Sequence, residues 1–199
     1  MLDVSHDHHL RAALKAHLTP KLGRDDLLVD EFGLAYGAAR ADLALVNGHL
    51  EGFEIKAARD TLTRLPSQVE AYSHVFEMAS IVTTRNHLAD VRLLLPQWWG
   101  ILLAVPRFHG VELTIHRKPR ANPSRSAHHL ARLLWRDETL AALNSLGLDR
   151  GLKSKPKLVL FDALAAAMPV SELADYVRIC LKARGDWRSA RGQSGCDGS

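Results

Sequence analysis

The sequence is poor in cysteine and aromatic residues, and it has no long hydrophobic run. Its 2 cysteines, Cys180 and Cys196, cannot form a disulfide framework, which excludes the small disulfide-stapled secreted class. The longest apolar stretch, Trp98 to Val105, covers 8 residues, whereas a membrane helix needs about 20. The first residues have neither the basic nor the long apolar region of a signal peptide. We therefore expect a cytoplasmic protein with no membrane partner.

Motifs of several common enzyme classes are also missing. There is no Gly-x-x-x-x-Gly-Lys phosphate loop, so we do not expect ATP use by this chain. No Gly-x-Ser-x-Gly elbow supports a serine nucleophile. The 11 histidines have no cysteine or acidic partner at zinc-like spacing, so we interpret them as surface or structural residues.

The composition is that of a globular protein, but its charge is unevenly divided. With 199 residues, 47% of them hydrophobic and 24% charged, the chain is long enough to bury a real core. Residues 1–116 hold 11 Lys and Arg against 14 Asp and Glu, whereas residues 117–199 hold 15 against 8. An acidic front and a basic back favour a polyanionic partner such as nucleic acid, although a solvated basic surface gives the same count.

Hydrophobic periodicity predicts alternating helices and strands in the first part of the chain. Leu10, Leu14 and Leu18 mark one face of a helix that ends at Pro20. Further expected elements are an apolar segment over 26–36, a hairpin over 41–56, a helix from Pro66 to Phe76, a strand at 79–84, a helix at 87–95 and strands at 98–105 and 111–116. This alternation indicates the α/β class.

A basic linker over 117–125 separates this part from a purely helical pattern. Leucine spacing predicts one helix or a broken pair from Leu130 to Leu143, then helices over 158–167 and 171–182, the last with Ser171 as N-cap. We therefore divide the chain into a core over 1–118, a basic helical extension over 119–185 and a Gly/Ser-rich tail over 186–199, expected to be disordered.

The hairpin register decides whether two carboxylates share one face. Asn47-Gly48 between alternating runs is a strong turn signal. A two-residue turn would mix leucines with charges on one face. An odd-length connection that sets Val46 opposite Leu50 brings Asp42 opposite Glu54 and separates the apolar face from the polar one. We predict the odd register.

Such a patch has a defined chemistry. Asp42 and Glu54 supply hard oxygen ligands that suit Mg²⁺ or Mn²⁺, and Lys56, two residues after Glu54, leaves the strand on the same face. A lysine there can orient a metal-bound water or stabilise charge on a phosphoryl oxygen. An exposed strand face with a Glu–Lys pair is the plainer interpretation of the same pattern.

Asp42 followed by Glu54-Ile55-Lys56 resembles the motif of the PD-(D/E)XK nuclease superfamily, and Gln68-Val69-Glu70-Ala71-Tyr72 resembles the Gln-x-x-x-Tyr motif of its RecB-like branch. The resemblance covers about residues 25–105 and implies a restriction-endonuclease-like αβββαβ core with a mixed sheet. Asp60 to Pro66 and Trp98-Trp99-Gly100 further resemble a group of bacterial proteins within this superfamily.

The resemblance implies a Mg²⁺- or Mn²⁺-dependent deoxyribonuclease. Asp42, Glu54 and the Ile55 carbonyl would hold the metal, and Glu31, favoured over Asp30, would assist. The expected catalytic set is Glu31, Asp42, Glu54, Lys56, Gln68 and Tyr72. The cations expected to contact phosphates are Arg40, Arg59, Arg64, Lys153, Lys155 and Lys157.

Several alternatives stay open at this stage. The chain could be a non-catalytic nucleic-acid-binding module on a nuclease scaffold, or the substrate could be RNA. The last two helices could form a helix-turn-helix or a lid on the core, and Arg178, Lys182 and Arg184 there could also neutralise phosphates. The sequence does not decide whether the protein is a homodimer.

Overall fold

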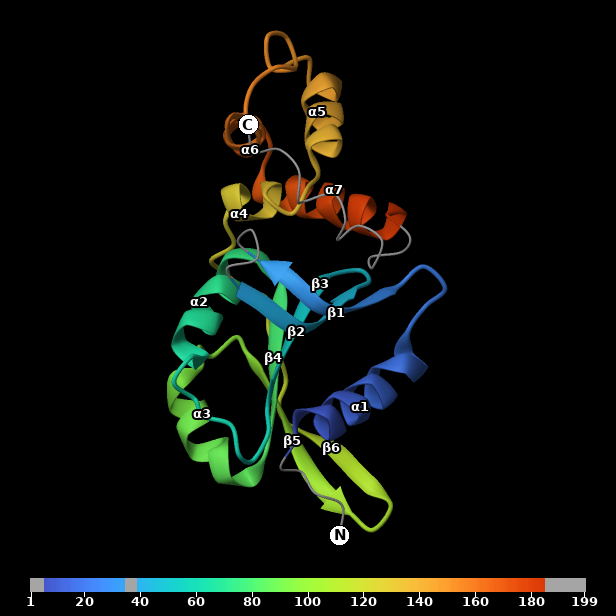
Figure 1. The fold of residues 1–199 in the computed structure, drawn as a ribbon, viewed down its shortest axis with the longest axis vertical. Coiled ribbons are helices and arrows are strands. Elements are labelled where there is room, and N and C mark those ends of the chain that lie inside the picture. The colour runs from blue at the N-terminus through green and yellow to red at the C-terminus, as the bar shows by residue number, and fades with distance from the viewer. Residues whose placement is uncertain (1–5, 35–38, 185–199) are drawn as a thin grey trace, which may run out of the picture.

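The computed structural model of the chain describes residues 6–34 and 39–184 (Figure 1). The elements in chain order are α1 (Asp7–Leu18), η1 (Thr19–Lys21), β1 (Leu27–Leu34), β2 (Ala39–Val46), β3 (Leu50–Lys56), α2 (Leu65–Val75), β4 (Met78–Thr83), η3 (Arg85–His87), α3 (Leu88–Leu94), β5 (Gly100–Arg107), β6 (Gly110–Arg117), α4 (Ala127–Ala131), α5 (Arg136–Ser145), α6 (Lys157–Ala167) and α7 (Val170–Ala183). The tail predicted over 186–199 lies outside the described residues.

A six-stranded sheet in the order β1-β2-β3-β4-β5-β6 forms the centre of the molecule. The first three strands are antiparallel neighbours, β3, β4 and β5 run parallel, and β6 returns antiparallel to β5. Figure 1 shows α2 and α3 on one side of this sheet, α1 on the other, and α4–α7 gathered at one end. The expected α/β class with a mixed sheet, flanking helices and a C-terminal helical region is confirmed.

The hairpin has the predicted odd register. Val46 pairs with Leu50 and Leu43 with Phe53, across a turn made by Asn47, Gly48 and His49. Within the turn the backbone N–H of Asn47 donates to the His49 carbonyl over 3.0 Å, and the Asn47 side chain accepts from the His49 N–H over 2.8 Å. Three connecting residues, rather than two, put the apolar positions of both strands on one face.

That apolar face packs against α1. Leu10, Leu14 and Leu18 are all buried there, as their spacing predicts. Their partners on the sheet include the residues that the odd register assigns to this face, namely Leu43, Leu45, Phe53 and Ile55. The opposite face of β2 and β3, which carries Ala44 and Glu54, turns toward α2.

A close approach between α2 and β3 depends on a glycine. A Cβ built on Gly52 would lie 2.5 Å from ring carbons of Phe76, which directly follows α2. Phe76 in turn packs against Tyr72, with ring centroids 4.9 Å apart and planes tilted by 54°. The missing side chain at Gly52 therefore sets how near α2 lies to the strand that carries Glu54 and Lys56.

The helical region is built from a broken pair followed by two longer helices. The helix expected over 130–143 is interrupted before Trp135, where the Glu138 side chain accepts the Trp135 N–H over 2.6 Å and begins α5. The prediction that Ser171 caps the last helix is wrong. Pro169 occupies the N-cap position: the N–H that proline lacks is not needed for a hydrogen bond at the start of a helix, and the backbone of Pro169 (φ −56°, ψ 146°) is already extended.

Within residues 6–34 and 39–184, no helix combines the length and the apolarity that a membrane crossing requires.

We expect Gly52→Ala to lower the free energy of unfolding by about 1–3 kcal/mol, because its methyl group would overlap the Phe76 ring. Gly33→Ala in β1 is the matched control: a Cβ there meets nothing within 4 Å, and we expect a change within about 0.5 kcal/mol. Urea unfolding of both variants measures the difference. Equal effects would show that the close approach at Gly52 does not constrain the fold.

Candidate functional site

Three carboxylates lie level with one another on three adjacent strands. The pairs Asp30↔Leu43 and Phe32↔Ala41 set Glu31 of β1 level with Asp42 of β2. Continuing the β2–β3 register by one residue beyond Leu43↔Phe53 sets Asp42 level with Glu54 of β3. Strand register therefore brings these three side chains to the same level of the sheet.

Asp42 lies where the β2–β3 pairing ends. The paired residues run from Val46↔Leu50 to Leu43↔Phe53, and beyond them Asp42 Oδ2 accepts the backbone N–H of Ile55 over 2.7 Å. A side chain thus replaces a main-chain acceptor as the strands separate. Because the N–H and C=O of a strand residue point to the same side, Ile55 also directs its carbonyl toward β2.

Glu54 is almost completely buried, at 1% exposure, and is held by three donors. Lys56 forms an ion pair with Oε1, and the Gln68 amide donates to the same oxygen over 2.6 Å. The Tyr72 hydroxyl donates to Oε2 over 2.8 Å. Spacing of i and i+4 on α2 points Gln68 and Tyr72 at one carboxylate, and this explains why a charged group can be buried there.

Gln68 keeps one unused hydrogen-bonding atom. Its Oε1 is buried and accepts no hydrogen bond from any described residue. A buried amide oxygen without a donor is costly, so such an atom points to a missing partner in the site. A water or a substrate hydroxyl could supply that donor.

The local electrostatics distinguish Asp42 from its neighbours. Burial, reinforced by the nearby Glu54 carboxylate, raises the pKa of Asp42 to about 6, against the opposing effects of the Ile55 N–H and Arg11. Burial also raises the pKa of Tyr72 well above its usual value, with Glu54 and Asp42 adding to the shift. Tyr72 therefore stays protonated and acts as a donor.

Glu31 has the unusual backbone of the site. Its φ of 53° lies in the left-handed region, which a non-glycine residue rarely adopts within a strand. Its carboxylate contacts Arg11 over 3.1 Å and Arg40 over 3.7 Å. Asp30, the alternative upstream acid, pairs with Lys15 over 2.6 Å and more distantly with Arg11 over 3.6 Å. Strained backbone of this kind tends to occur at functional positions.

Arg11 is a site residue that the sequence did not reveal. It extends from α1, and its guanidinium lies 3.0 Å from Asp42 Oδ1 and 3.1 Å from Glu31 Oε1. Burial opposes its charge, but the carboxylates of Asp7, Asp42 and Glu31 outweigh that effect and raise the pKa of Arg11. The helical period of α1 indicates only the packing face, and a contact across 31 residues leaves no local signal.

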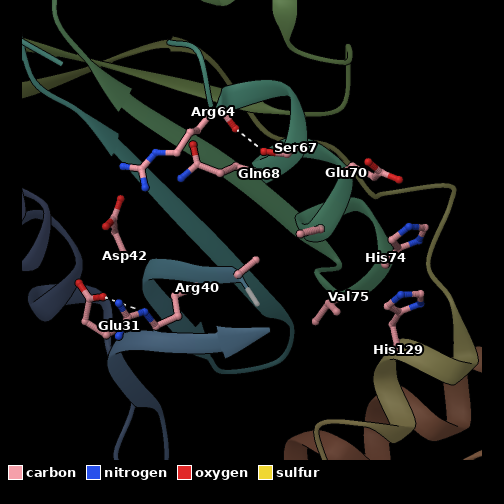
Figure 2. Close-up of a pocket in the computed structure, with 12 residues that line it drawn as sticks. Glu31, Arg40, Asp42, Arg64, Ser67, Gln68, Glu70, His74, Val75 and His129 are labelled. Atoms are coloured by element: carbon pink, nitrogen blue, oxygen red, sulfur yellow. Dashed lines mark hydrogen bonds and ion pairs between the residues drawn. The ribbon is translucent and has the colours of Figure 1, made fainter. Parts of the chain in front are cut away.

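A cleft of about 600 Å³ opens beside the carboxylates (Figure 2). It is lined by Glu31, Ala39, Arg40, Asp42, Arg64, Ser67, Gln68, Glu70, Ala71, His74, Val75 and His129. Figure 2 shows Arg64 reaching toward Asp42 beside Gln68, and Arg40 next to Glu31. Of the predicted phosphate-binding cations, Arg40 and Arg64 therefore line the cleft that also holds Asp42.

The far end of the cleft is closed by the helical region. His129 of α4 stacks on His74 of α2, with ring centroids 4.2 Å apart and planes 10° from parallel. From sequence, both histidines are expected to be only surface or structural residues. Arg64, just before α2, follows helical spacing with Gln68, Ala71 and Val75, and these positions mark the helix face that lines the cleft. Helical periodicity therefore indicated this wall of the cleft in part.

The other predicted cations lie elsewhere. Arg59 is exposed in the connection after β3 and does not line the cleft. Lys153, Lys155 and Lys157 are exposed at the α5–α6 connection, which Figure 1 shows at the end of the helical region away from the sheet. The structure thus does not bring these four residues to the carboxylates.

Three cations of α7 and its end are engaged in ion pairs. Arg178 contacts Glu77, Lys182 contacts Asp26 over 3.5 Å, and Arg184 contacts Glu138 over 2.5 Å. The sequence suggested these cations as phosphate contacts, but two of the pairs connect α7 to the core. Their charge is largely neutralised within the protein.

The donor set of the site suits a hard divalent cation. Within the described part of the chain, no three His, Cys, Asp or Glu side chains are grouped as metal ligands. Two carboxylates, a main-chain carbonyl and waters remain as candidate ligands, and Mg²⁺ is typically bound by one or two carboxylates with several waters. The like charges of Asp42 and Glu54 and the unused Gln68 oxygen are both compatible with such an ion and its water.

Comparisons with known proteins identify a phage relative and a structural likeness. Protein cII of Enterobacteria phage P4 is 24% identical over 185 residues, which is 92% of this chain and 69% of the phage protein. A solved structure of a protein of unknown function from Silicibacter pomeroyi aligns with a TM-score of 0.47 at 18% identity, over 78% of this chain and 98% of that one.

The family comparison covers nearly the whole chain. Residues 3–191 match the family described as Bacteriophage P4 protein cII. The match includes the sheet, the site and the helical region, so it is not confined to one element. The chain belongs to the bacteriophage P4 protein cII family.

Proposed function

We propose that this protein is a metal-dependent nuclease of the PD-(D/E)XK type that hydrolyses phosphodiester bonds in DNA. One observation carries the proposal: Asp42 and Glu54 lie level on adjacent strands beside a cleft, and Lys56 is paired with Glu54. Buried carboxylates next to a lysine are costly to maintain, and a stable fold has no need of them at this place. A catalytic role explains why they occur together.

The residues that would hold the ion are Asp42, Glu54 and the Ile55 carbonyl, with Glu31 beside them. A bound Mg²⁺ or Mn²⁺ would lower the pKa of a coordinated water and neutralise charge on the phosphate. The raised pKa of Asp42 supports this assignment, because a nearby cation would relieve the repulsion between it and Glu54.

The remaining side chains position the reacting groups. Lys56 can donate to the attacking water or to a phosphate oxygen, while its pairing with Glu54 fixes its place. Gln68 and Tyr72 hold Glu54 in place by donating one hydrogen bond to each of its two oxygens. The unpaired Gln68 oxygen can accept a hydrogen bond from the attacking water. Arg40 and Arg64 can bind the phosphates that flank the scissile bond.

The alternative of a non-catalytic nucleic-acid-binding module has one observation in its favour. Both oxygens of Glu54 are already bound to protein donors, so the carboxylate is satisfied without an ion. RNA in place of DNA is not distinguished by the residues of the cleft. Both alternatives are separated from the proposal by the cleavage experiment below.

We expect purified protein to cleave DNA in Mg²⁺ or Mn²⁺, and Lys56→Ala or Asp42→Asn to reduce the rate by about 100-fold or more, because each removes a group acting on the transition state. The assay follows plasmid, linear, single-stranded DNA and RNA on gels, with and without EDTA. Glu70→Gln, a carboxylate of the same cleft with no assigned role, is the matched control and should retain full activity. If all nucleic acids stay intact, or if Lys56→Ala cleaves like wild type, the nuclease assignment is wrong.

We expect Tyr72→Phe to lower the free energy of unfolding by about 1–3 kcal/mol. The buried Glu54 carboxylate would lose the hydrogen bond that the Tyr72 hydroxyl donates to it. Tyr176→Phe is the control. Its hydroxyl donates to the neutral Glu138 carbonyl over 2.8 Å in a half-buried setting, so we expect a loss of about 1 kcal/mol or less. Denaturant unfolding compares the two, and a larger loss for Tyr176→Phe would contradict the restraint of Glu54.

We expect Arg64→Gln to weaken binding of a short DNA oligonucleotide and to reduce the slope of log affinity against log salt by about 1, because one phosphate contact is lost. Fluorescence anisotropy in EDTA measures this binding apart from cleavage. Replacing Lys153, Lys155 and Lys157 together by glutamine should affect only long DNA, since these residues lie away from the cleft. If the triple variant alone weakens short-DNA binding, the cleft is not where DNA is held.

A further inference from the structure

Arg11 brings a fixed positive charge into the carboxylate cluster. Its Nη2 atom lies within 3.2 Å of oxygens from Asp7, Glu31 and Asp42, and its Nη1 atom also bonds the Asp42 main-chain carbonyl. The side chain is 19% exposed. The guanidinium is therefore held from several directions and is not a freely moving surface group.

The two oxygens of Asp42 face different partners. Oδ2 points to the Ile55 N–H, on the side of β3 and Glu54, whereas Oδ1 points to Arg11 on the side of Glu31. The carboxylate thus separates two places where a cation could bind. The place toward Glu54 lies beside Lys56, which is paired with Glu54, and the place toward Glu31 is taken by the guanidinium.

A metal ion on the Glu31 side would compete with Arg11 for the same two carboxylate oxygens. An Mg²⁺ that bridged Asp42 Oδ1 and Glu31 Oε1 would lie about 2.0–2.1 Å from each oxygen. Nη2 of Arg11 lies 3.0 and 3.1 Å from those same two atoms. An ion bound to both oxygens would lie within about 5 Å of Nη2, where the two positive charges would repel each other.

We propose that Arg11 stands in for a second metal ion, so that the site takes one divalent cation on the Asp42–Glu54 side and Arg11 positions Asp42 for it. This inference rests on the proposed nuclease function. In two-metal sites the second ion stabilises one of the oxygens of the displacement, and a guanidinium can stabilise the same charge without exchanging with solvent. Arg11 also neutralises Glu31, which is then not a direct ligand.

The packing of α1 keeps the Arg11 guanidinium fixed in the site. Arg11 lies between Leu10 and Leu14, which are both completely buried against the sheet, so the helix cannot withdraw without exposing core residues. Asp7, one turn earlier, holds the guanidinium at Nε and Nη2. The charge is fixed to the fold and does not depend on the metal concentration.

The test is Mn²⁺ titration by calorimetry on the full chain without DNA, so that it does not depend on activity. We expect one ion per wild-type chain, two per chain in Arg11→Met, and one again in Arg11→Lys, because lysine restores the positive charge. Thermal unfolding accompanies each variant to establish that it is folded. If Arg11→Met does not fold, Arg11→Gln, which also removes the charge, replaces it and is expected to bind two ions; two ions in wild type contradict the proposal in either case.

The remaining outcomes are also decisive. One ion in both wild type and Arg11→Met would show that Arg11 does not exclude a second ion, and the nuclease proposal would stand without it. Binding to Arg11→Met alone would show that Arg11 blocks the whole site, which also contradicts the inference. Absence of Mn²⁺ binding in every variant would overturn the proposed metal-dependent function and this inference with it.

Discussion

The burial of Glu54 is the constraint on which the rest of the site depends. A carboxylate at 1% exposure must be matched by donors, and Lys56, Gln68 and Tyr72 supply them from its own strand and from α2. These bonds require α2 to lie close to β3, which the absent side chain of Gly52 permits. The position of α2 then defines one wall of the cleft, so one buried charge determines where a substrate could enter.

Positive charge serves two different purposes in this protein. The sequence suggests a basic second half that faces a polyanion, but Arg178 and Lys182 are paired with acids of the first half, Glu77 and Asp26. Part of that charge therefore joins the helical region to the core. The acidic cluster, in turn, carries its own cation in Arg11. A net count by sequence position does not separate cations that bind internally from those available to a ligand.

The confirmed predictions were those that followed from the periodicity of helices and strands or from the pairing of neighbouring strands. The register of the hairpin followed from sorting Leu43 and Phe53 away from charge, because a slip by one residue would have moved every side chain to the other face. The prediction of Ser171 as a cap relied on residue preference alone and failed against the neighbouring Pro169. The break before Trp135 was left undecided because it depends on the Glu138 side chain bonding back to the main chain.

By itself, the sequence determined the α/β class, the hairpin register, the shared strand face of Asp42, Glu54 and Lys56, and the shared helix face of Gln68 and Tyr72. Strand and helix periods fix which side chains share a face, and these periods are local properties of the chain. Only the tertiary structure decided that Arg11 lies against Asp42, that His129 closes the cleft and that Lys153 lies away from it. Those relations join residues far apart in the chain through the packing of α1 and of the helical region on the sheet, and such packing leaves no periodic trace in the sequence.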